Sequence, residues 1–124
     1  MANINVYLEI GKKKVFASAL DWPGWSRGGR DEDQALQTLL DYGPRYAKVL
    51  NGSGLKFQAP AELSQLVVLE RLPGTSTTDF GAPVIIPDFD NAPFNNQILE
   101  ISQKLLQSCW QAFDNAVQAA AGRE

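Results

Sequence analysis

Residues 4–36 read INVYLEIGKKKVFASALDWPGWSRGGRDEDQAL, and this stretch decides the fold. Apolar and polar side chains alternate over residues 4–10, which is the period of a half-buried strand. A turn follows at Gly11 and Lys12, and residues 15–20 form a second run of small and apolar side chains. The pattern predicts an antiparallel hairpin, a tight turn at residues 21–24, and a short third strand over residues 25–29.

A helix is predicted to begin after this strand. The Asp31 carboxylate can accept the free amides of a first helical turn, and Gln34 stands three residues later, as in a capping box. Leucines then recur at helical spacing towards Leu50. Gly43 and Pro44 must kink or break this helix, because proline lacks an amide hydrogen and crowds the preceding turn.

The remainder of the chain predicts one more strand and one long helix. Residues 66–72 have strand character, and residues 73–96 form a long segment rich in Gly, Pro, Thr, Asp and Asn. A helix is expected over about residues 97–121, capped by Asn95 or Asn96. We therefore expect a single α+β domain over residues 1–124: an antiparallel sheet of three to four strands, a packed and kinked helix, and a C-terminal helical extension.

Composition narrows the function. The 124 residues carry a net charge of −3 and no histidine, which removes the commonest proton carrier and metal ligand. Cys109 is the one cysteine, and we expect it to be sheltered in a core. The sequence thus predicts no enzyme, no cofactor and no metal site. No signal peptide or membrane span is apparent, so we expect a cytoplasmic protein without a membrane partner, and the acidic balance makes a nucleic-acid partner unlikely.

Two aromatic and basic patches are candidate binding sites. The first surrounds the turn at Trp22 and Trp25 and adds Arg27 and Arg30, because Trp and Arg are enriched at binding hot spots. The alternative is that both indoles cover the hydrophobic core. The second patch surrounds the helix kink and contains three residues, Tyr42, Arg45 and Tyr46.

A third candidate lies in the polar segment after Gly74. Hydroxyls and amides there, including those of Thr77 and Thr78, have the character of a phosphate or anion site, although no phosphate-binding lysine motif accompanies them. Asp79 belongs to the same candidate group. The alternative is a plain polar turn.

The last helix is apolar over about half of its circumference, whereas packing on one core needs an arc of about 100°. One stripe contains Leu105, Cys109 and Ala112. The adjacent stripe is our candidate interface and comprises Leu99, Leu106, Trp110, Phe113 and Val117. We expect this stripe to bind a second copy of the chain, which predicts a homodimer. The alternatives are that it binds sequence not present in this chain, or that the helix lies in a groove of its own domain.

The run from Ala19 to Leu36 also resembles the core signature of HicB-like domains: a strand ending in a Pro-Gly turn, a short strand ending in glycine, and a capped helix opening with acidic residues. The resemblance covers residues 4 to about 50, with 66–72 as the fourth strand. It implies a β-β-β-α-β arrangement and a non-catalytic domain. In antitoxins, such a domain binds and masks a small toxic ribonuclease.

The chain is also similar to a family of uncharacterised, longer bacterial proteins. The similarity includes the Leu-Asp-Trp-Pro-Gly-Trp turn at 20–25, residues 42–46 and 71–74, and Thr-Thr-Asp-Phe-Gly-Ala-Pro at 77–83. In those proteins a DinB-like helical part follows. Three functions stay open: an interaction or ligand-binding domain, the N-terminal regulatory or binding part of a longer enzyme, and an antitoxin.

Overall fold

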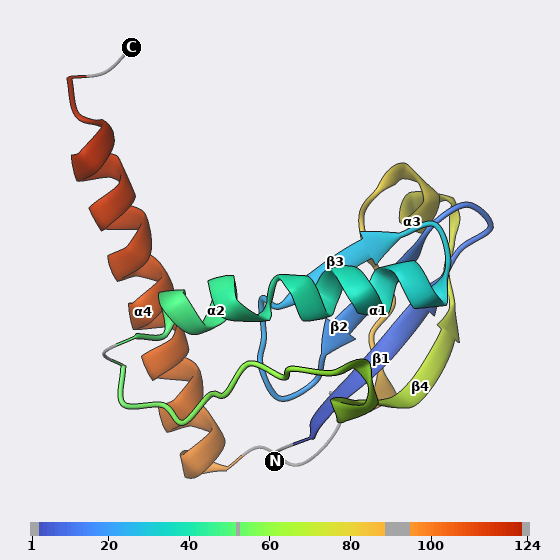
Figure 1. Ribbon diagram of the computed structural model, residues 1–124, viewed down its shortest axis with the longest axis horizontal. Coiled ribbons are helices and arrows are strands. Elements are labelled where there is room, and N and C mark those ends of the chain that lie inside the picture. Colours follow the sequence, from blue (N-terminus) through green and yellow to red (C-terminus); the bar gives the residue numbers. More distant parts are fainter. Residues whose placement is uncertain (1–2, 52, 89–94, 123–124) are drawn as a thin grey trace. The chain divides into compact units, whose positions relative to one another are not determined.

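The computed structural model describes residues 3–51, 53–88 and 95–122, and it confirms the α+β class (Figure 1). The chain divides into two compact units. We call Met1–Pro44 with Gln58–Ala92 the sheet unit, and Arg45–Phe57 with Pro93–Glu124 the helical unit. Each unit is built from segments that are distant in sequence, and the expectation of a single domain stays a prediction.

The sheet unit contains four strands, β1 (Ile4–Ile10), β2 (Val15–Ala19), β3 (Ser26–Gly29) and β4 (Leu66–Pro73), in the order β3-β2-β1-β4. β1 and β2 pair as the predicted antiparallel hairpin, and β3 pairs antiparallel with β2. The alternation read from the sequence is therefore correct over these three strands.

β4 corrects the expectation of a purely antiparallel sheet. It pairs with β1 in parallel, with an irregularity in the register between Val6 and Tyr7. Short turns join β1 to β2 and β2 to β3, and such turns reverse the chain direction. A long connection through α1 (Glu32–Asp41) and α2 (Gly43–Val49) instead precedes β4, so this strand can start at the same end as β1. The sheet is mixed.

α1 covers one face of the sheet, in front of it in the view of Figure 1. Asp31 is the N-cap as predicted, since its carboxylate accepts the Gln34 amide at 2.8 Å; the Gln34 side chain accepts the Arg30 amide at 2.7 Å, and not that of Asp31 as in a capping box. The helix can approach β3 closely because Gly29 has no side chain: a Cβ there would lie 2.6 Å from the Ala35 nitrogen. Beneath the helix, the core contains Val6, Leu8, Ala17, Ala35 and Leu39, all fully buried.

The opposite face of the sheet is partly covered by the segment after β4. This segment was expected to lack regular structure, but residues Ser76–Phe80 form a short helix, α3, with a capping box between Thr75 and Thr78. The chain then passes behind the sheet (Figure 1). A single 3-10 turn, η1 (Leu63–Gln65), precedes β4.

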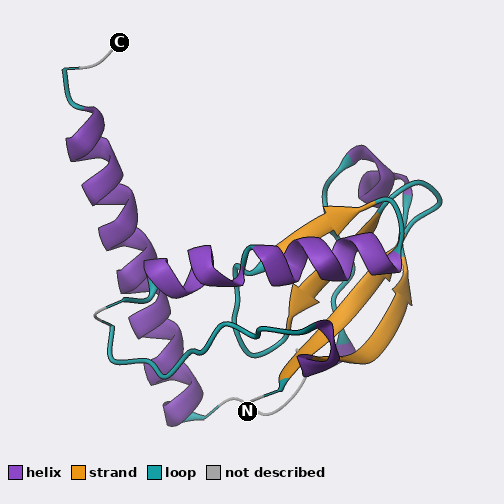
Figure 2. Cartoon of the chain, viewed as in Figure 1, coloured by secondary structure: helices purple, strands orange, loops and turns teal. Residues whose placement is uncertain are grey.

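The helical unit contains most of α2 and all of α4 (Asn96–Ala120), which Figure 2 shows in purple. Asn95 caps α4 by accepting the Ile98 amide at 2.9 Å, as predicted. Tyr46, Leu50 and Leu105 form the buried centre of this unit. In the described part of the chain, no helix has the length and apolar character that crossing a membrane requires.

Candidate functional site

The turn between β2 and β3 places its two indoles differently. Trp25 is 2% exposed, and its indole nitrogen donates a hydrogen bond to the Leu39 carbonyl at 3.0 Å. Trp22 is half-buried. Gly24 adopts a φ of 90°, which glycine tolerates and other residues rarely do. Trp25 therefore ties the turn to α1 as a core residue, which is the alternative considered from the sequence.

A hollow of about 330 Å³ lies beside this turn, within the sheet unit. Tyr7, Ser18 and Ser26 are among its lining residues, and the two serine hydroxyls share a hydrogen bond of 2.7 Å. Pro23 and Ile85 also line it. No charged side chain is among the described residues that line this hollow.

Arg27 and Tyr42, which the sequence placed in separate patches, lie together. The guanidinium carbon of Arg27 is 4.1 Å from the centre of the Tyr42 ring, which is cation–π geometry. The Arg27 Nε atom is buried and has no hydrogen-bond partner among the described residues. Tyr42 is the C-cap residue of α1, so this pair joins β3 to the end of the helix.

The remaining aromatic and basic candidates are divided between the units. Arg30 is exposed in the sheet unit, and Arg45 is exposed in the helical unit. Tyr46 is buried, and its ring meets Phe57 edge-on at 5.1 Å. Burial raises the pKa of the Tyr46 hydroxyl above its usual value of 10.0, with a further contribution from Cys109. Tyr46 thus belongs to the core of the helical unit.

Asp79 binds the tip of the β1–β2 hairpin. Its carboxylate accepts the backbone amides of Lys13 at 2.7 Å, Lys14 at 3.1 Å and Lys12 at 3.3 Å. These hydrogen bonds, led by that of Lys13, lower the pKa of Asp79 below its ordinary 3.8. An added Cβ at Gly11 would collide with the same carboxylate. The amides that bind this carboxylate thus belong to the hairpin tip and not to the predicted anion site after Gly74.

Glu9 is a buried residue that sequence reasoning placed on a polar face with Asn5 and Tyr7. Its carboxylate is fully buried and accepts the Thr78 hydroxyl at 2.6 Å and the Ile85 and Val84 amides at 2.8 and 3.1 Å. The burial of Glu9 could have been predicted from the apolar run Val84 to Ile86, because such a run can cover the second face of a sheet. Glu9 and Thr78 therefore fasten this covering segment to β1.

Two further hydrogen bonds involve the segment that follows β4, one at Thr77 and one at Glu70. Thr77 is exposed, and its amide donates to the Thr75 hydroxyl at 3.2 Å within the cap of α3. Glu70 of β4 accepts the Asp88 amide at 2.9 Å. The segment from Thr75 to Asp88 is thus held to the rest of the sheet unit by three carboxylates, those of Glu9, Glu70 and Asp79.

Cys109 is exposed, so the expectation that it is sheltered in a core is wrong. Only the stripe of α4 containing Ile101, Leu105 and Ala112 is covered, and Leu105 is the one buried residue of this helix. Among the described residues, no three His, Cys, Asp or Glu side chains come together as a group suited to a metal ion.

The candidate interface residues of α4 all face outward. Their exposed fractions lie between 42% and 60% for the five residues Leu99, Leu106, Trp110, Phe113 and Val117. The rings of Trp110 and Phe113 meet edge-on at 6.3 Å. We call these five residues the α4 apolar face.

Comparison of the chain with protein-family models, curated proteins and solved structures finds no significant match. The resemblance to HicB-like domains therefore stays a prediction, and what the chain does must be inferred from its own surface.

Proposed function

We propose that this chain is a non-catalytic binding module that self-associates through the α4 apolar face. The observation that carries the proposal is the exposure of five large apolar side chains on one helix. Single exposed apolar residues are ordinary on protein surfaces, whereas contiguous ones mark interaction sites. Trp and Phe lie near the middle of this row, and aromatic residues are enriched at interface centres.

The spacing of the face suits a second copy of the same helix. Leu99, Leu106 and Phe113 follow one another at intervals of seven residues. Trp110 and Val117 are also seven residues apart, four residues after Leu106 and Phe113 respectively. A repeat of 3.5 residues is the pattern of a helix that packs along its length against another helix. The row contains no charged residue, so two copies can meet without burying a charge.

The row is also self-complementary. In an antiparallel pair of α4 helices centred near Ser108, Leu106 of one copy lies against Trp110 of the other, and Leu99 lies against Val117. Each contact then combines a larger and a smaller side chain, and a twofold axis produces each of these contacts twice. We propose this isologous dimer as the assembly.

The non-catalytic part of the proposal has separate support. The chain has no histidine. The carboxylates of Glu9 and Asp79 already accept several hydrogen bonds each from the fold, and these interactions commit them to holding backbone segments. They are therefore poor candidates for proton transfer to a substrate.

The test is light scattering of the full chain at micromolar concentration, comparing the wild type with a Leu106→Glu, Trp110→Glu double variant. We expect the wild type to be a dimer and the variant a folded monomer, because charge on both helices opposes their packing. The matched control is Gln107→Glu with Gln111→Glu, which adds the same charge one residue further along the helix and should leave the dimer intact. A wild-type monomer, or equal dissociation in both variants, contradicts the proposal.

A further inference from the structure

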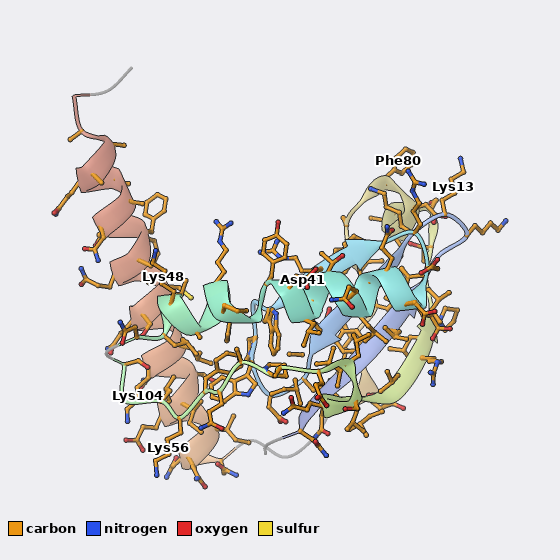
Figure 3. All side chains as sticks on the ribbon, viewed as in Figure 1. Lys13, Asp41, Lys48, Lys56, Phe80 and Lys104 are labelled. Atoms are coloured by element: carbon orange, nitrogen blue, oxygen red, sulfur yellow. The ribbon has the colours of Figure 1, made fainter. Side chains whose placement is uncertain are left out.

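A cavity of about 360 Å³ lies within the helical unit, between the end of α2 with its following turn and the middle of α4. Two lysines contribute to its lining, Lys48 from α2 and Lys104 from α4; Figure 3 labels both. Carboxamides supply much of the remaining surface, from Asn51, Gln107, Gln111 and Asn115, together with two serines. None of the described residues that line the cavity is acidic.

The helical unit, which contains this cavity, differs in net charge from the sheet unit. The sheet unit has six basic and eleven acidic residues, a net charge of −5, whereas the helical unit has five basic and three acidic residues, a net charge of +2. Glu100 is the carboxylate nearest to Lys104 on α4, at 4.0 Å, and both side chains are largely solvent-exposed. Such a pair contributes little, so Lys104 retains its attraction for an anion.

The carboxamides point to the remainder of the ligand. Each carboxamide has two donor hydrogens and an acceptor oxygen, so several together suit a molecule rich in hydroxyl groups. Gln111 donates to Asn115 at 2.9 Å, which orients both amides and leaves the Asn115 amide hydrogens and the Gln111 oxygen available in this pair. The volume is within the range of small-ligand sites, which begins at about 300 Å³.

We propose that this cavity binds a small phosphorylated polyol, of the sugar-phosphate class, with the two lysines holding the phosphate and the carboxamides holding the hydroxyls. At 100° per residue, Lys104, Gln111 and Asn115 lie on the side of α4 opposite Leu106 and Phe113. The site is therefore independent of the proposed dimer contact.

The experiment is calorimetric titration of the full chain with glucose 6-phosphate, with glucose and inorganic phosphate as separate probes, and with amide chemical shifts to locate the binding. We expect saturable binding of glucose 6-phosphate, about tenfold tighter than that of either fragment. Lys48→Gln and Lys104→Gln should each weaken it about tenfold, because each removes a charge-assisted hydrogen bond. Lys56→Gln is the matched control, a lysine of the same unit that does not line the cavity.

Several results would overturn the proposal: no saturation, shifts outside residues 48–53 and 104–115, or an equal loss in Lys56→Gln. Phosphate alone binding as tightly as glucose 6-phosphate would also overturn the assignment to the sugar-phosphate class. Binding should persist in the Leu106→Glu, Trp110→Glu variant, so failure of this site and failure of the dimer are distinguishable.

Discussion

The sheet unit and the helical unit differ in how they bury apolar residues. The sheet unit has a fully buried core between α1 and the sheet, which includes Leu8 and Leu39, and it fastens the segment covering the other face with buried or bridging carboxylates. In α4, by contrast, one residue of 25 is buried, and the aromatic side chains Trp110 and Phe113 are exposed. Apolar residues such as Phe80 and Ile86 are also exposed in the sheet unit, but those of the helical unit follow one another along a single helix.

This difference indicates where binding is to be sought. The aromatic and basic residues that looked most like a recognition site, around the Trp22 to Trp25 turn, mainly serve the core and its edge. Trp25 donates to α1, and Arg27 stacks on Tyr42. The α4 apolar face, by contrast, consists of five large apolar side chains that are each at least 42% exposed.

The same substitution made in both units should have very different effects. Leu39→Ala removes a fully buried side chain from the core of the sheet unit and should lower the free energy of unfolding by about 3 kcal/mol. Leu106→Ala removes a side chain that is 60% exposed, so the loss should stay within about 0.5 kcal/mol when the chain is monomeric. Urea unfolding at concentrations low enough to disfavour association measures both. Equal losses would show that the two leucines have similar environments.

Glu9→Ala tests whether a buried carboxylate holds the covering segment. The substitution leaves the Thr78 hydroxyl and the Val84 and Ile85 amides without their acceptor, and we expect a loss of about 2–3 kcal/mol. Glu9→Gln keeps one acceptor oxygen and should lose less. Asp21→Ala, an exposed acidic residue of the same unit, is the control. Hydrogen exchange should show faster exchange at Val84 and Ile85 in the alanine variant; unchanged exchange there would refute the assigned role.

The smallest expected effect concerns Asp79 and acid. The pKa of Asp79 is lower in the folded chain than its ordinary 3.8, so the ionised form is favoured by folding. Its contribution is therefore complete above the unfolded pKa and is lost as the pH falls through the folded pKa. Asp79→Asn should therefore have its full destabilising effect at neutral pH, and the difference from the wild type should shrink as the pH falls below that ordinary value. Thermal unfolding from neutral to acidic pH measures this, and parallel profiles would contradict it.

Local patterns in the sequence predicted most of the sheet unit. The period of two over residues 4–10 identified β1, and the Asp31 and Gln34 pair identified the start of α1. Strand direction was missed because alternation shows which side chains share a face but not which way a neighbouring strand runs. α3 was missed because five residues are too few for a helical period to appear.

The candidate sites were harder to predict, because they depend on contacts between distant residues. Glu9 reads as a solvent-facing strand residue until the segment near Val84 folds over it. Asp79 reads as part of a ligand site until its carboxylate meets the amides of Lys12 to Lys14, which lie more than sixty residues away. Cys109 was assigned to a core because helical spacing places it near Leu105, yet the covered stripe of α4 is narrower than that assignment required.

Sedimentation equilibrium of the wild-type chain over a range of micromolar concentrations tests the central claim most directly. The account predicts a molar mass that rises with concentration from the 13.6 kDa of one chain towards twice that value. A folded chain that stays at 13.6 kDa throughout this range would show that the α4 apolar face does not bind a second copy.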